Sequence, residues 1–230
     1  MCGVRVLRTY LRSRTSGGLL ASHSRLHGST QYRVPWEVDP ADNPADPLSS
    51  SAILRGAVRL KHRLMPYLLR LAHEAHARGT PLLRAMFLEF PEDRACWGLD
   101  TQYMLGDALL VAPVFGGAGA AAEFYVPAGR WVGLLDARVR DGPAWHREAH
   151  GLDSLPLLVR PGHAVLLAHE EERAHFSLAE KGFELRVNGA QTGATVVRGG
   201  ANAEEEIAVR WAEGEARLGD GQVKGKVVML

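Results

Sequence analysis

The spacing of hydrophobic residues changes along this chain, and one stretch has the period of a helix. Between Ser51 and Arg78 apolar residues recur every three or four positions, with charged residues between them. This spacing predicts an amphipathic helix. Ser51 is a plausible N-cap, and Gly79 suits the left-handed residue that ends many helices. Pro66 lies inside the stretch, and we expect it to kink the helix because it removes one backbone hydrogen bond.

Two apolar runs lie on either side of that helix. The first, Gly18 to Ala21, is short, and the second, Pro81 to Phe90, is stopped by Pro91. We interpret the second run as a buried strand. Residues 37–51 are rich in Pro, Asp and Ser and predict a loop before the helix. A strand, a loop, a helix and a strand in this order are typical of an α/β fold.

From about Tyr103 onward, short strand-like runs alternate with turn signals. The runs are 108–115, 122–126, 130–135, 155–159 and 164–167, and the Gly- or Pro-containing signals are 116–117, 127–129, 141–143 and 160–162. Regular short strands with such turns predict an all-β sandwich. Residues 171–230 are more polar and continue with the runs 183–187, 194–197, 207–211 and 223–230. The predicted fold class is therefore α/β followed by all-β.

Composition adds limits on function and location. The chain has 230 residues, 46% of them hydrophobic, which allows one large or two small globular domains. Its 27 basic and 26 acidic residues nearly cancel, so neither nucleic acid nor an acidic membrane is an expected partner. No apolar run is long enough to span a membrane. Cys2 and Cys96 make no disulfide framework, which favours a reducing compartment and predicts a cytoplasmic protein.

The first 36 residues contain arginines but no acidic residue. Three interpretations remain open. The segment could be an organelle transit peptide, which is typically Arg- and Ser-rich. It could be a partly helical surface segment. We prefer the third interpretation, in which the start is artificial and these residues are a remnant of upstream sequence.

Several residues that could suggest chemistry are better explained as structural. His73 and His76 are three positions apart, whereas the helical zinc motif needs histidines four apart, so we expect a solvated helix face and no metal site. Cys96 precedes Trp97, and we interpret the pair as a buried structural cysteine beside a core tryptophan.

The carboxylates near the second apolar run form no convincing catalytic pair. They are Glu89, Glu92, Asp93, Asp100 and Asp107. Retaining glycosidases need two carboxyl groups about 5–5.5 Å apart. For Glu89 and Asp93 the alternative is a helix cap or a salt bridge to Arg84 or Arg94. We therefore assign no catalytic residue.

Arg25 and His27 are the stronger functional candidates. They are two positions apart, so on a strand they share one face. Both side chains can hydrogen-bond a sugar hydroxyl. The alternative is an arginine that binds loop carboxylates and a histidine satisfied in the core.

A series of motifs, in order along residues 18–168, resembles glycoside hydrolase family 31. The motifs are 22–36, 63–68, 87–91, 99–107, 110–114, 125–131 and 155–162. The sequence Ser-Arg-Leu-His-Gly at 24–28 is similar to the α-xylosidase branch of that family rather than to its α-glucosidase branch.

The resemblance implies a fold and a site. Residues 1–105 would be the last strands and helix of a (β/α)8 barrel, 106–170 a proximal β-sandwich domain and 171–230 part of a distal β domain. His27 would hold a sugar hydroxyl in the −1 subsite, and Arg25 would shape the same pocket. The family's Asp nucleophile and Asp acid/base follow earlier barrel strands, and neither motif is present here. No cofactor is implied.

We therefore expect a C-terminal fragment of a retaining α-glycosidase, of the α-xylosidase type, that is inactive alone. If a separate chain completed the barrel, an α-xyloside or α-glucoside would be its substrate, and the parent enzyme could be a homo-oligomer. The alternative is a non-catalytic carbohydrate-binding or interaction module. That module would need exposed aromatic residues, for which Trp131, Trp145 and Trp211 are the candidates.

Overall fold

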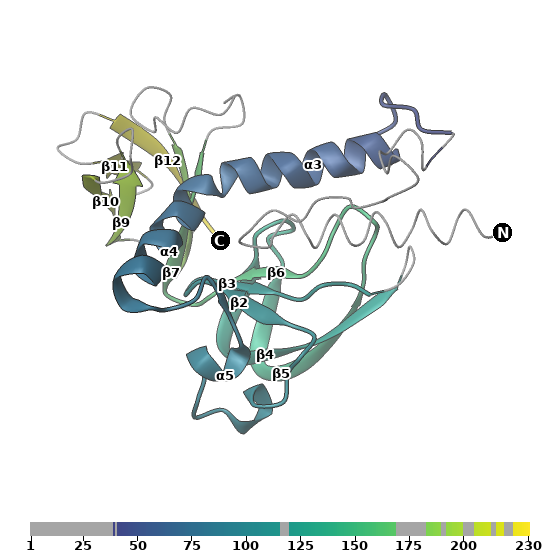
Figure 1. Cartoon of the computed structure of the whole chain (residues 1–230), viewed down its shortest axis with the longest axis horizontal. Helices are drawn as coiled ribbons and strands as arrows, with labels where there is room; N and C mark the ends of the chain where they lie inside the picture. The colour runs from purple at the N-terminus through teal and green to yellow at the C-terminus, as the bar shows by residue number, and fades with distance from the viewer. Residues whose placement is uncertain are drawn as a thin grey trace.

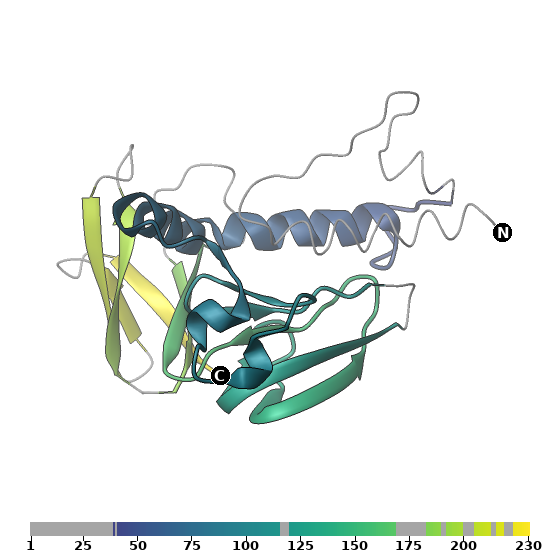
Figure 2. The ribbon, with the colours of Figure 1, turned by 60° about the horizontal axis from the view of Figure 1, so that its bottom comes forward.

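The computed structural model describes residue 39 and residues 41–115, 120–168, 183–189, 192–199, 205–212, 215–218 and 223–230. The described strands form two sheets, and two consecutive helices run above them (Figures 1 and 2). None of the helices in these ranges is long and apolar enough to cross a membrane.

The predicted kinked helix is confirmed as two helices, α3 (Ser50–Arg63) and α4 (Met65–Arg78). The break falls at Leu64, and Pro66 lies in the first turn of α4, where its missing N–H costs nothing. Gly79 ends α4 with a φ of 72°, as predicted. The N-cap is Ser49 rather than Ser51, because the Ser51 hydroxyl and backbone N–H both donate to Asp42 instead.

The prediction of a buried strand over 81–90 is wrong for most of its length. Strand β1 (Leu83–Arg84) has two residues and is followed by the short helix α5 (Met86–Glu89). In α5 the backbone N–H of Phe90 donates to the carbonyl of Met86, which closes one helical turn. The apolar run was ambiguous because a short run cannot distinguish a strand from a helical segment by periodicity.

The first sheet has the strand order β1-β2-β3-β6-β4-β5. Its further strands are β2 (Tyr103–Leu105), β3 (Leu109–Val111), β4 (Ala121–Gly133), β5 (Val139–Ala149) and β6 (Leu157–Val159). Each neighbouring pair in it is antiparallel. The expected boundary at 105/106 thus lies between two paired strands, and the barrel part of the fold prediction is not confirmed.

The predicted turns at 127–129 and 141–143 are wrong, because both lie within the long hairpin of β4 and β5. The register shifts between Val126 and Gly129, and Gly142 lies opposite this irregularity. A Cβ atom on Gly142 would lie 2.0 Å from the carbonyl oxygen of Pro127, so glycine is needed for close backbone approach. Pro143 is tolerated because β5 is an edge strand. Here Gly and Pro mark an irregular β-ladder rather than a turn.

The second sheet has the order β7-β8-β12-β11-β10-β9. It contains β7 (His163–Ala168), β8 (Phe183–Asn188), β9 (Gly193–Gly199), β10 (Glu205–Ala212), β11 (Glu215–Leu218) and β12 (Val223–Met229). Strand β12 is parallel to β8. The strands predicted in this region are confirmed, and β11 was missed because Ala216 is its buried residue between exposed charged neighbours.

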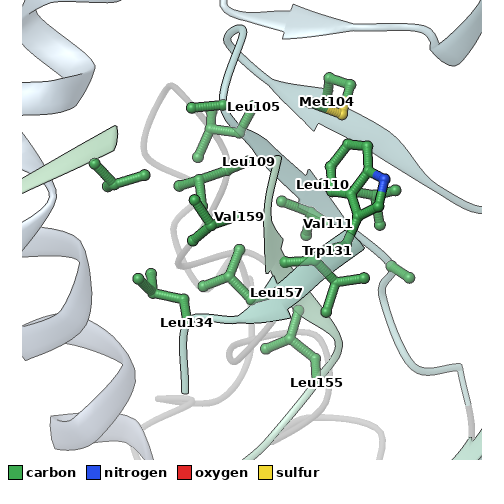
Figure 3. Close-up of a cluster of buried hydrophobic side chains, with 14 of the residues drawn as sticks. Met104, Leu105, Leu109, Leu110, Val111, Trp131, Leu134, Leu155, Leu157 and Val159 are labelled. Atoms are coloured by element: carbon green, nitrogen blue, oxygen red, sulfur yellow. The ribbon is translucent and has the colours of Figure 1, made fainter. Parts of the chain in front are cut away.

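The main core lies between α4 and the first sheet. Trp131 is fully buried there beside aliphatic residues of β3 and β6 (Figure 3). Helix α4 and its N-cap Leu64 contribute Leu64, Tyr67, Leu68 and Leu71 to this core. Burial of each leucine stabilises the fold by roughly 1.5–3 kcal/mol. The second sheet has a smaller core of its own, which includes Trp211.

Candidate functional site

Arg25 and His27, the predicted sugar-binding residues, lie outside the described residues. Their placement therefore stays a prediction. The described part contains the carboxylates and the aromatic residues that were considered as candidates from the sequence. Their hydrogen bonds and exposure show which of them are available to bind a ligand.

Glu89 is held between two arginines. Its Oε1 accepts from Arg84 Nη1 at 2.6 Å and its Oε2 from Arg160 Nη1 at 2.8 Å. Arg84 is itself buried and also pairs with Glu74 on α4 at 3.0 Å. Both oxygens of Glu89 are thus used to join α5 to the sheet, and the salt bridge expected as the alternative role is confirmed.

Asp107 joins the β2–β3 turn to α4. It forms an ion pair with Arg70, and the hydroxyl of Tyr67 donates to the Leu105 carbonyl at 2.7 Å and accepts from the Ala108 N–H at 3.1 Å. Burial would raise the pKa of Asp107, but the Arg70 guanidinium outweighs burial and holds that pKa below its ordinary value. The carboxyl is therefore ionised at neutral pH and cannot serve as a proton donor.

Asp93 organises the loop that follows α5. It accepts from the N–H of Ala95 at 3.1 Å, which caps the 3-10 turn η1 (Arg94–Cys96), and from the hydroxyl of Tyr125 at 2.8 Å. Burial, together with this bond to Asp93, raises the pKa of Tyr125 to about 12. Burial likewise raises the pKa of the Cys96 thiol to about 12, so Cys96 is a structural residue, as predicted.

Sequence reasoning missed a second cluster, centred on Arg140. This buried guanidinium donates to Glu148 through Nε at 2.8 Å and Nη2 at 2.6 Å, and to Asp136 Oδ2 at 2.7 Å. Its hydrogen bonds lower the pKa of both carboxyl groups. Strand spacing gave no signal, because Arg140 and Glu148 lie eight positions apart on β5 and Asp136 precedes that strand.

The tryptophan side chains differ widely in solvent exposure. Trp131 and Trp211 are buried, so of the three candidates for sugar stacking Trp145 alone is open, with 57% of its surface exposed. Its ring lies 5.7 Å from that of Tyr125. Trp97 is 62% exposed, so the prediction that it is a core residue is wrong. This distribution gives little support to the carbohydrate-binding module.

No cluster of three or more His, Cys, Asp or Glu side chains suited to a metal ion occurs in the described ranges. The carboxylates discussed above act as ion-pair partners and caps. In the described part of the chain, ion pairs thus join α4, α5 and the first sheet.

Comparison with known proteins gives a consistent result. Residues 79–165 match the Glycosyl hydrolase family 31 C-terminal domain. The chain is 44% identical over 181 residues, 75% of its length, to an α-xylosidase of Emericella nidulans, and 42% identical over 153 residues, 65% of its length, to an α-xylosidase of Lactiplantibacillus pentosus. These matches span 22% and 19% of the two relatives, so the chain corresponds to about a fifth of their length.

Solved structures agree at the level of fold. The GH31 α-xylosidase of Xanthomonas citri superimposes on 95% of this chain and 24% of its own, with a TM-score of 0.74 and 24% identity. The GH31 dextranase of Flavobacterium johnsoniae superimposes on 94% of this chain and 27% of its own, with a TM-score of 0.75 and 21% identity. The chain is therefore an α-xylosidase-like C-terminal segment of glycoside hydrolase family 31.

Proposed function

We propose that this chain is the C-terminal part of a retaining α-glycosidase that hydrolyses α-xylosides. The observation that carries the proposal is its identity to two α-xylosidases over most of its length. The Ser-Arg-Leu-His-Gly sequence at 24–28 supports the same substrate class. Strands that the chain lacks would supply the Asp nucleophile and the Asp acid/base, so the chain alone is inactive.

The proposed reaction is a double displacement with retention. One carboxylate attacks the anomeric carbon while the other carboxylic acid protonates the departing oxygen, and water then releases the sugar. In this proposal, His27 hydrogen-bonds a hydroxyl of the sugar in the −1 subsite and Arg25 shapes the same pocket. The role of the described residues is support, since Glu89 and its two arginines fix the segment after β1 to the sheet.

The test uses a single-polypeptide chimaera in which this chain replaces the matched segment of the Emericella nidulans α-xylosidase. We expect the purified 230-residue chain to leave an aryl α-xyloside intact and the chimaera to hydrolyse it. His27→Ala in the chimaera should lower kcat/KM on the order of tenfold or more, since a lost hydrogen bond costs about 1–2 kcal/mol. His76→Ala, on the exposed side of α4, is the matched control and should retain full activity.

Three results would contradict parts of this proposal. Hydrolysis by the isolated chain would overturn its inactivity. An active chimaera that is indifferent to His27→Ala would remove His27 from the site. A chimaera that melts cooperatively but hydrolyses no α-xyloside would overturn the substrate class.

A second test of the proposal uses the gene sequence. We expect the coding DNA upstream of Met1, read in all frames, to encode a barrel with both aspartates. Upstream DNA that encodes nothing similar would leave a separate chain as the source of the barrel.

A further inference from the structure

Asn188 and Gly189 form a dipeptide that is chemically labile. Asparagine is one of the thermolabile residues of proteins. The backbone nitrogen of the next residue attacks the side-chain amide carbon of asparagine, which expels ammonia and closes a five-membered succinimide ring. Water then opens the ring to an aspartyl or isoaspartyl residue. A following glycine favours ring closure, because it lacks a side chain and its backbone adopts many conformations.

The fold requires both members of this pair. The Asn188 side chain is buried, and its Nδ2 donates to the carbonyls of Arg130 and Val159, both at 2.8 Å. Gly189 has a φ of 127°, a backbone conformation that favours glycine. A Cβ atom at Gly189 would also lie 3.1 Å from the backbone nitrogen of Gly162. Replacement of either residue by a less reactive one would therefore disturb the structure.

Asn188 lies where the two sheets meet. It is the last residue of β8, whereas Arg130 lies on β4 and Val159 on β6, within the main core (Figure 3). The carbonyl of Asn188 accepts from the N–H of Gly162 at 2.7 Å. We call the contacts of Asn188 with Arg130, Val159 and Gly162 the sheet junction. Ring closure requires the amide to rotate out of its two hydrogen bonds, so the junction has to open before Asn188 can react.

We propose that Asn188 is a site of spontaneous deamidation whose rate is set by opening of the sheet junction. The closed junction protects the pair. Because reclosing is much faster than ring closure, the rate follows the equilibrium population of the open form. One carbon–nitrogen bond forms as another breaks, ammonia leaves, and water is the co-reactant. The modified fraction therefore increases with the time that the junction spends open.

The product would damage the junction. An aspartyl side chain at position 188 replaces the amide donor by a carboxylate that faces the carbonyl oxygens of Arg130 and Val159. A buried charge without a partner costs far more free energy than a hydrogen-bonded amide. An isoaspartyl product would in addition lengthen the backbone at the end of β8. Deamidation of Asn188 is thus irreversible and leaves a less stable protein.

The first experiment measures deamidation by mass spectrometry. The purified full chain is incubated at mildly alkaline pH with and without urea, and the modified fraction of the peptide containing Asn188 is followed with time. We expect modification to be at least about a hundredfold slower without urea, since buried segments open rarely. Asn43 is the internal control. It is exposed but precedes Pro44, whose nitrogen carries no hydrogen, so it should stay unmodified in urea. Equal rates at Asn188 with and without urea would overturn the proposal.

A matched pair of variants tests the role of the junction. Arg186 on β8 also reaches the first sheet, because its Nη1 donates to the carbonyl of Leu134 at 2.5 Å. Arg186→Ala should therefore speed the modification of Asn188 about threefold or more, because it raises the open population. Arg217 on β11 is exposed and pairs with Glu215 of its own strand, so Arg217→Ala should leave the rate unchanged. Equal rates in the two variants would overturn control by the junction.

The predicted damage is tested with Asn188→Asp, which reproduces one product directly. Its melting temperature at mildly alkaline pH should be lower than that of Asn188→Ala, because alanine removes the same donor but adds no charge. Failure of Asn188→Asp to fold while Asn188→Ala folds would support the same conclusion. Equal melting temperatures would overturn the damage. No glycoside enters these measurements, so their outcome is independent of the proposed function.

Discussion

Glu89 shows how single residues in this molecule serve the fold rather than the reaction. A carboxylate beside a predicted barrel strand is a natural candidate for glycosidase chemistry, yet both of its oxygens accept hydrogen bonds from arginines. The sequence could suggest the partner Arg84, five positions away. It could not suggest Arg160, which is 71 positions away and reaches Glu89 only in the folded chain.

We predict that Glu89→Gln lowers the free energy of unfolding by about 2–3 kcal/mol, because it leaves the buried Arg84 with Glu74 as its remaining carboxylate. This value is below that for a fully buried pair, since Arg160 is partly exposed. Urea denaturation followed by circular dichroism measures the change. Glu123→Gln, at an exposed position on β4, should change stability by less than about 0.5 kcal/mol. Equal effects of the two substitutions would contradict the role of the ion pairs.

Among the elements, those with a regular pattern were predictable. The two helices follow from apolar spacing interrupted by Pro66 and ended by Gly79. The strands of the second sheet other than β11 follow from their alternating or β-branched residues. The hairpin of β4 and β5 was not recognised, because its glycines and prolines serve an irregular ladder. Helix α5 was missed because two of its apolar residues face outward.

The irregular ladder gives a prediction about this hairpin. Gly142→Ala should destabilise the protein by about 1–3 kcal/mol, because the new methyl group would collide with the backbone carbonyls of Pro127 and Val126. Gly56→Ala is the opposite control. A Cβ at Gly56 in α3 meets nothing within 4 Å, so this change should stabilise by about 0.5–1 kcal/mol. The melting temperatures of both variants, compared with that of the wild type, measure the predicted loss and gain of stability. A Gly142→Ala variant as stable as the wild type would contradict the predicted collision.

At the scale of the whole molecule, the two sheets and the two helices are connected by the main core, which includes Val165 and Leu167 of β7, and by polar contacts. Arg63, at the end of α3, pairs with Glu184 of β8 at 2.8 Å. Asn188 is buried and donates to the carbonyls of both Arg130 and Val159 at 2.8 Å. Long-range contacts of this kind leave no local pattern. The predicted sugar site stays a prediction for a different reason, because Arg25 and His27 lie outside the described residues.

We predict that Asn188→Ala lowers the free energy of unfolding by about 1–3 kcal/mol, because the buried carbonyl of Val159 and the partly buried carbonyl of Arg130 lose this donor. The loss should also uncouple the sheets, so that hydrogen exchange in β8 becomes faster than in β4. Asn43→Ala, at an exposed turn, should cost less than about 1 kcal/mol. Uniform exchange rates in the Asn188 variant would show that other contacts suffice to couple the sheets.

The contribution of α4 to the main core has a practical consequence for anyone who excises this domain. A recombinant piece cut at the family limits, 79–165, would lose Leu64, Tyr67, Leu68 and Leu71. The β2–β3 turn would then lose the Tyr67 hydroxyl, which bonds the carbonyl of Leu105 and the N–H of Ala108. Leu71 would no longer fill the space beside Gly106. The segment matched by the family model is thus smaller than the unit defined by packing, which starts no later than Leu64 and extends at least into the second sheet.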